Sequence, residues 1–113
     1  MISIQNKLRH VRETLLTVSE DVYHYRRPKD VKTSYIVWAE DSEDGSFSAD
    51  NWRAEQQIHG TIDFFTLIEF DETVDAIQEA LDNSDDLIGW NLAAVSYEDE
   101  TNLIHYEWDF WVA

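Results

Sequence analysis

The segment before the C-terminal alanine, Leu103–Val112, alternates polar and apolar residues, and this alternation constrains the fold more than any other segment. The apolar half of it is Ile104, Tyr106, Trp108, Phe110 and Val112. Successive side chains of an extended strand point to opposite faces of a sheet, so this row predicts one apolar sheet face. Such a face must be buried, and other elements of the chain have to cover it.

The polar half of the same segment raises the question of a metal or catalytic site. It contains His105, Glu107 and Asp109, with Trp111 in the same row. If a strand predicted at 55–66 lies beside it, His59 and Asp63 join this surface. Two histidines and three carboxylates are sufficient ligands for Zn, Mn or Fe.

Strand geometry and composition favour a simpler interpretation of that row. Side chains on one face of a strand lie about 7 Å apart per step, so one ion rarely binds three of them. The chain also contains 24 Asp and Glu residues, so a histidine near carboxylates is expected by chance. We therefore predict no metal, cofactor or catalytic residue, and a charged face that is exposed or meets a neighbouring subunit.

Two segments have helical periodicity. In the first, one stripe contains Ile4, Leu8, Val11, Leu15 and Val18, and Ser3 precedes it as a candidate N-cap. In the second, within 70–84, Asp71 is placed to cap a helix whose stripe is Val74, Ile77 and Leu81. Both stripes predict helices that pack on a sheet.

The remaining apolar segments predict strands at 22–25, 34–40, 55–66, 88–97 and 103–112, the last two as a hairpin. The order α-β-β-β-α-β-β predicts an α+β fold, with an antiparallel or mixed sheet of four to five strands and both helices packed on one face. The 113 residues are expected to form a single domain, 1–113, with a mobile acidic loop at 41–51.

Charge is distributed unevenly along this chain, whose net charge is −16. Residues 1–33 hold seven Lys and Arg against four acids, whereas residues 34–113 hold one Arg against twenty acids. The acidic region disfavours nucleic acid as a direct ligand, because phosphates would be repelled. A basic segment on an acidic body predicts either a helix folded onto its own sheet or a head-to-tail contact between subunits, which generates rings or filaments.

Several function classes lack their sequence signals. The chain has three glycines, no cysteine and no Gly-x-Ser-x-Gly, so we predict no enzyme of the phosphate-loop, thiol or serine-hydrolase kind. The longest apolar run, 35–39, is too short to span a membrane. Trp52 and Trp111 fall where a monomer buries them poorly, and aromatic side chains of this kind often anchor interfaces. The predicted subunit interface comprises Lys7, Arg9, Arg12, Arg26, Arg27, Lys29, Trp52, His105, Glu107, Asp109 and Trp111.

Taken in order, these segments resemble a known family. An amphipathic helix is followed by "SYIVWAED", a polar loop, "EQQIHGTIDFFT", a helix "FDETVDAIQEAL" and a hairpin "WNLAAVSYEDETNLIHYEWDFWVA". This order resembles the tail terminator (tail completion) and neck proteins of long-tailed bacteriophages and prophages. The resemblance implies a homo-oligomeric ring, a hexamer, that caps the tail tube and receives the head connector. It implies no catalytic residue, no cofactor and no sequence-specific nucleic-acid binding. The expected location is the virion, and the bacterial host cytoplasm during assembly.

A second hypothesis belongs to a different class. The acidic body is also typical of an inhibitor that mimics DNA, of the immunity or anti-restriction kind, with a basic protein as its partner. Such an inhibitor would bind its partner tightly and with strong salt dependence, whereas a terminator would bind tail-tube ends.

Overall fold

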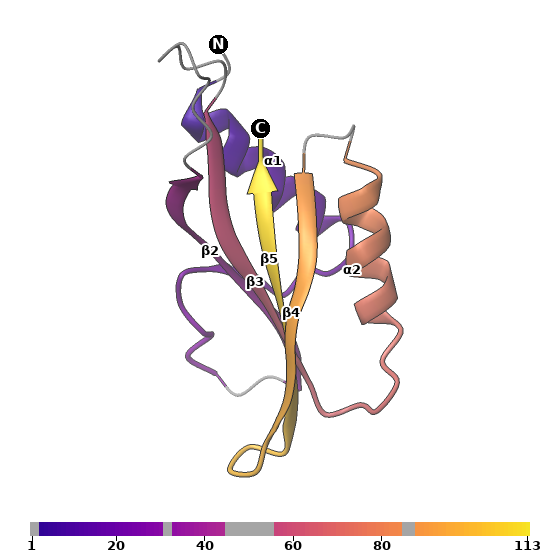
Figure 1. Cartoon of the computed structure of the whole chain (residues 1–113). Helices are drawn as coiled ribbons and strands as arrows, with labels where there is room; N and C mark the ends of the chain where they lie inside the picture. The colour runs from indigo at the N-terminus through magenta and orange to yellow at the C-terminus, as the bar shows by residue number, and fades with distance from the viewer. Residues whose placement is uncertain (1–2, 31–32, 45–55, 85–87) are drawn as a thin grey trace.

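The structure is a computed structural model that describes residues 3–30, 33–44, 56–84 and 88–113. Two helices and five strands follow one another in the predicted order (Figure 1). They are α1 (Ile4–Leu16), β1 (Val22–His24), β2 (Ser34–Asp44), β3 (Gln57–Thr66), α2 (Thr73–Asp82), β4 (Ile88–Glu98) and β5 (Leu103–Val112). The predicted α+β class is confirmed.

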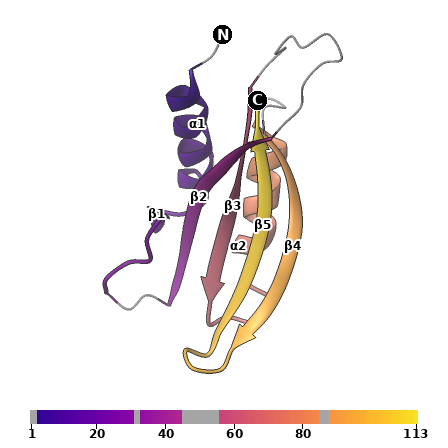
Figure 2. The same ribbon diagram turned by 60° about the vertical axis from the view of Figure 1, so that its left-hand side comes forward.

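The five strands form one mixed sheet in the order β1-β2-β3-β5-β4. β1 pairs with β2 in parallel, and the other three neighbouring pairs are antiparallel. β3 and β4 are therefore parallel to each other, with β5 between them and α2 in the connection. The predicted hairpin of β4 and β5 closes the chain, and Figure 2 shows its turn at one end of the molecule.

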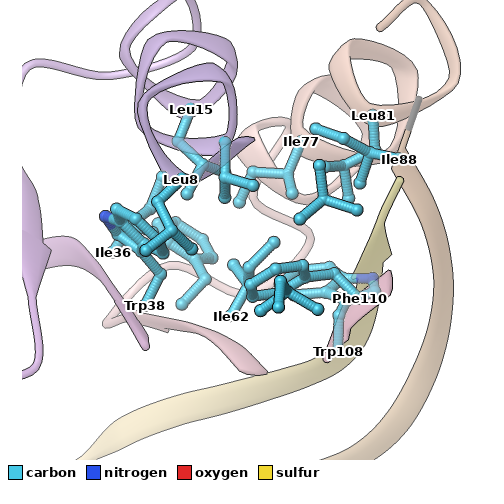
Figure 3. Close-up of a cluster of buried hydrophobic side chains, with 14 residues drawn as sticks. Leu8, Leu15, Ile36, Trp38, Ile62, Ile77, Leu81, Ile88, Trp108 and Phe110 are labelled. Carbon is cyan, nitrogen blue, oxygen red and sulfur yellow. The ribbon is translucent and has the colours of Figure 1, made fainter. Parts of the chain in front are cut away.

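Both helices cover the same face of the sheet, as predicted (Figures 1 and 2). Figure 3 shows Leu8 and Leu15 of α1 and Ile77 and Leu81 of α2 above the sheet. Below them lie side chains of the sheet that are at most 2% exposed: Ile36, Trp38, Ile62, Trp108 and Phe110. Burying each of these large apolar groups contributes about 1.5–3 kcal/mol, so this layer provides most of the stability.

Side chains cap the first turns of both helices. The Ser3 hydroxyl accepts a hydrogen bond from the N–H of Asn6 at 3.1 Å. The Asp71 carboxylate accepts one from the N–H of Thr73 at 2.9 Å and one from the Thr66 hydroxyl at 2.6 Å. These bonds satisfy N–H groups that have no partner inside the helix. They also tie α2 to the end of β3.

β2 is longer than the sequence predicts. Residues 41–44, which we expected in the acidic loop, continue the strand and pair with β3 as far as Asp44 opposite Gln57. The register shifts between Glu40 and Ser42, so a bulge accommodates Asp41. Pairing with a long neighbouring strand overrides the turn-like composition here, because strand formation depends on partners more than on local preference. The rest of the predicted loop and Trp52 lie outside the described residues.

Candidate functional site: two charged surfaces on opposite sides of the sheet

The face of the sheet without helices carries a row of histidines and carboxylates, here named the acidic face. β3 and β5 are neighbours, with Asp63 opposite Glu107, Thr61 opposite Asp109, and His59 opposite Trp111. The hypothesis that His59 and Asp63 join the polar row of β5 is therefore confirmed. The acidic face comprises Asp41, His59, Asp63, His105, Glu107 and Asp109.

His59 is held between two carboxylates from the neighbouring strands. Its Nδ1 lies 2.7 Å from Asp41 Oδ1, and its Nε2 lies 3.1 Å from Asp109 Oδ1. Burial alone would lower the pKa of His59, but hydrogen bonds to Asp41 and Asp109 outweigh it and raise the pKa. Burial likewise acts to raise the pKa of Asp41, yet hydrogen bonds from His59 and Ser42 lower it. His59 therefore links the bulge of β2 to β5 most strongly when protonated.

The His59 bridge makes part of the stability dependent on pH. Because the folded chain binds this proton more tightly than the unfolded chain, the contribution is complete below the usual histidine pKa of 6.5 and disappears as pH rises through the raised value. We expect the His59→Gln variant to lose more free energy of unfolding, relative to wild type, at about pH 5.5 than at about pH 8.5. Urea unfolding at the two pH values measures this. An equal loss at both would contradict the assignment.

His105, Asp63 and Glu107 form a second cluster further along the same face. His105 Nε2 lies 2.6 Å from Asp63 Oδ1, and the His105 ring stacks on Phe65 with centroids 4.3 Å apart. One ligand atom from each of the three residues lies within 4.8 Å of the other two. All three side chains are half-buried. The structure therefore gathers groups that the sequence separates by more than forty residues.

Trp111 lies in the same row and is half-buried, with its ring 5.3 Å from the ring of His59. The other interface tryptophan predicted from sequence, Trp52, lies outside the described residues. The strand pattern is consistent with core positions for Trp38, Trp90 and Trp108. Trp38 and Trp108 are 2% and 0% exposed, whereas Trp90 is half-buried and packs against the core.

The predicted basic residues divide between the two sides of the sheet: those of α1 lie on the other side, whereas Arg27 lies over Phe65, whose ring also stacks on His105 of the acidic face. Arg9 and Arg12 are exposed on α1, which covers the face opposite the acidic one. Lys7 is only 4% exposed, and its ammonium group donates a hydrogen bond to the carbonyl of Gln56. This charge is therefore directed at a group of its own chain.

The other predicted basic residues, Arg26, Arg27 and Lys29, belong to the connection between β1 and β2. Arg27 lies 4.4 Å above the Phe65 ring and 3.5 Å from Glu98 in an ion pair. Arg26 and Lys29 are exposed. Only Arg27 of the predicted basic set therefore reaches an acidic group of its own chain in the described residues.

A third histidine–carboxylate group was not anticipated. His24 lies between the rings of Trp38 and Tyr25, with centroids 3.9 and 3.8 Å away, and its Nε2 is 2.7 Å from Glu40. Burial raises the pKa of Glu40, but bonds from Tyr25 and His24 outweigh it and lower the pKa. Arg9 belongs to the wall of the adjacent cavity. This group depends on the parallel pairing of β1 with β2, for which the sequence gives no signal.

The edge strand β4, predicted as an apolar strand, exposes several of its apolar side chains. Leu92, Val95 and Tyr97 are 41%, 54% and 57% exposed. Figure 1 shows α2 beside the first half of β4, while the second half continues past it toward the hairpin turn. The segment 88–97 contains no charged residue. Natural edge strands usually carry charges that prevent pairing with other chains, so this edge is suited to contact with a protein.

Comparisons with known proteins support the fold. No protein-family model matches the chain, and no curated protein matches it. Among solved structures, it is similar to a chain of the "Virion of native gene transfer agent (GTA) particle", with a TM-score of 0.55 and 16% sequence identity. The similarity covers 97% of this chain and 92% of that chain. At this identity it establishes a shared fold over nearly the whole length. Among the described residues, neither helix is long and apolar enough to cross a membrane.

Proposed function

We propose that this protein is a structural component of a phage or prophage virion, of the tail terminator kind. In this role it assembles as a homo-oligomeric ring, a hexamer, at the head-proximal end of the tail and joins the tail tube to the head connector. Two findings support the proposal: the order of the sequence segments, and a fold shared with a chain of a virion particle. The proposal assigns no catalytic role and no cofactor.

The observation that carries the assembly part is the separation of charge across the sheet. Arg9 and Arg12 project from the helix on one side, and Asp63, Glu107 and Asp109 lie on the other. The sheet prevents these groups from neutralising each other within one chain. A head-to-tail contact brings the basic side of one subunit to the acidic face of the next, and repeated contacts of this type close into a ring.

The assembly is expected to depend on Arg9 and Arg12. Reversing both charges (Arg9→Glu with Arg12→Glu) replaces attraction by repulsion at the proposed contact, so the oligomer should dissociate to monomers at moderate salt. Size-exclusion chromatography with light scattering measures the mass. Glu79→Lys, an exposed change on α2, is the control and should leave the oligomer intact. Raising the salt should weaken the wild-type oligomer, because screening acts over about 10 Å or less.

The partner of the ring is tested separately. Purified tail tubes incubated with the protein should carry it at one end in electron micrographs, and the Arg9/Arg12 double variant should be absent from those ends. If wild-type protein is a monomer in solution and also fails to bind tube ends, the proposal is wrong.

A second candidate, an acidic inhibitor of a basic protein, is favoured by the concentration of carboxylates on a face without helices. It makes the opposite prediction for the variants. Binding to a basic nuclease would depend on Glu107 and Asp109, and the Arg9→Glu with Arg12→Glu variant would bind it equally well or more tightly. Neither protein would bind tail tubes.

A further inference from the structure

Two observations distinguish the carboxylates of Asp63 and Glu107, beside His105, from ordinary solvated ones: they are opposite each other on neighbouring strands, and no described Lys or Arg pairs with them. Asp63 and Glu107 are directly opposite each other on β3 and β5, and both are half-buried. Like charges at such positions repel and destabilise the pairing of strands. No Lys or Arg in the described part of the chain pairs with either of them.

Glu107 is the group that remains without compensation. Asp63 accepts a hydrogen bond from His105, whereas the carboxylate of Glu107 has no hydrogen bond or ion pair with any described residue. His59, the other histidine of the acidic face, cannot relieve it, because both of its ring nitrogens are engaged by Asp41 and Asp109. A further positive charge beside Glu107 would therefore stabilise the cluster.

The two-strand arrangement also removes the geometric objection raised by the sequence. Three ligands along one strand would be too widely spaced for one ion. Here only His105 and Glu107 come from β5, one step apart, and Asp63 is contributed by β3 from directly opposite Glu107. Ligands of a tetrahedral ion with bonds of about 2.1 Å are about 3.4 Å apart. The three ligand atoms all lie within 4.8 Å of one another, which is close to that spacing.

We propose that Asp63, His105 and Glu107 bind one divalent transition-metal ion on the acidic face. One imidazole nitrogen and two carboxylate oxygens suit Zn²⁺ or Mn²⁺, with the remaining coordination positions open to water. The ion compensates Asp63 and Glu107 and joins β3 to β5 through their side chains. Binding of the ion requires only one chain, although Asp63 and Glu107 also belong to the acidic face that the proposed subunit contact uses.

Isothermal titration calorimetry of the full chain with ZnCl₂, and separately with MnCl₂, tests the site. We expect one ion per chain for wild type, and an affinity at least about tenfold weaker for His105→Ala and for Glu107→Gln. Glu100→Gln is the matched control, because it removes the same charge from an exposed position in the hairpin turn. Its affinity should equal that of wild type.

A second measurement locates the ion and does not depend on the variants folding. Mn²⁺ is paramagnetic, so substoichiometric amounts should broaden the ring-proton NMR signals of His105 before those of His24, which lies near Glu40 at the β1–β2 edge. Absence of saturable binding to wild type would overturn the proposal. So would an equal loss of affinity in Glu100→Gln and Glu107→Gln, or prior broadening of His24, since each would indicate diffuse attraction to an acidic protein.

Discussion

Replacing Trp108 by alanine is expected to cost about 4 kcal/mol of the free energy of unfolding, a large share of the roughly 5–15 kcal/mol that stabilises a typical domain. Trp108 is fully buried at the centre of β5, between the sheet and the two helices (Figure 3). Its Nε1 donates a hydrogen bond to Gln78 Oε1 of α2 at 3.1 Å. The substitution therefore leaves a cavity and also releases a tie between α2 and the sheet.

Trp111→Ala is the matched control for this experiment. It removes the same side chain three residues further along the same strand, but from the acidic face, where the ring is only half-buried beside His59. We expect a loss of about 1 kcal/mol. Urea unfolding followed by circular dichroism measures both variants. Trp108→Phe keeps most of the volume and provides a measurable value if the alanine variant does not fold. Similar losses for Trp108→Ala and Trp111→Ala would show that the core is not where the structure has it.

Replacing Gly60 by alanine is expected to have an effect almost as large, about 3 kcal/mol, although it adds a single methyl group. A Cβ atom at this position would lie 2.2 Å from the carbonyl oxygen of Ala39 and 2.6 Å from the ring of Phe110. The Phe110 ring could turn only into a filled core, and the Ala39 oxygen belongs to the backbone just before the bulge of β2. Relief therefore requires movement of a strand.

Gly89→Ala is the control for the glycine experiment. The nearest atom to a Cβ there is the Trp111 carbonyl oxygen at 4.0 Å, an ordinary contact on the exposed edge strand. We expect a change within about 0.5 kcal/mol, because surface substitutions without a specific clash rarely exceed that. Thermal unfolding of the two variants provides the comparison. A Gly60→Ala protein as stable as Gly89→Ala would mean that β2 and β3 are further apart than described.

The residues of the candidate site could be predicted from the sequence, but which of them lie opposite each other could not. The alternation in β5 identified His105, Glu107 and Asp109 as one face, and the same periodicity in β3 offered His59 and Asp63. Only the order of strands determines that these two rows are neighbours and that Asp63 is opposite Glu107. Strand order depends on contacts between residues far apart in the chain, which no local pattern contains.

The basic residues illustrate the same limit. Periodicity places Arg9 and Arg12 away from the apolar stripe of the first helix, but it could not predict the burial of Lys7 or the contact of Arg27 with Glu98. Both depend on where a distant segment returns to the helix or to the hairpin. The sequence left two alternatives, a helix on its own acidic sheet or a contact between subunits. The helix α1 does fold onto its own sheet, but onto the face opposite the acidic one, so Arg9 and Arg12 do not meet those carboxylates within one chain.

By itself, the sequence determined the elements, their order and the face that each side chain occupies, because the periods of a helix and of a strand are local properties of the backbone. It also determined the charge of the two regions. Tertiary structure decided which strands became neighbours, how far β2 extended, which edge was left uncovered and which carboxylates met a histidine. These features follow from pairing and burial across the whole chain, where a gain in packing outweighs the local preference of any one segment.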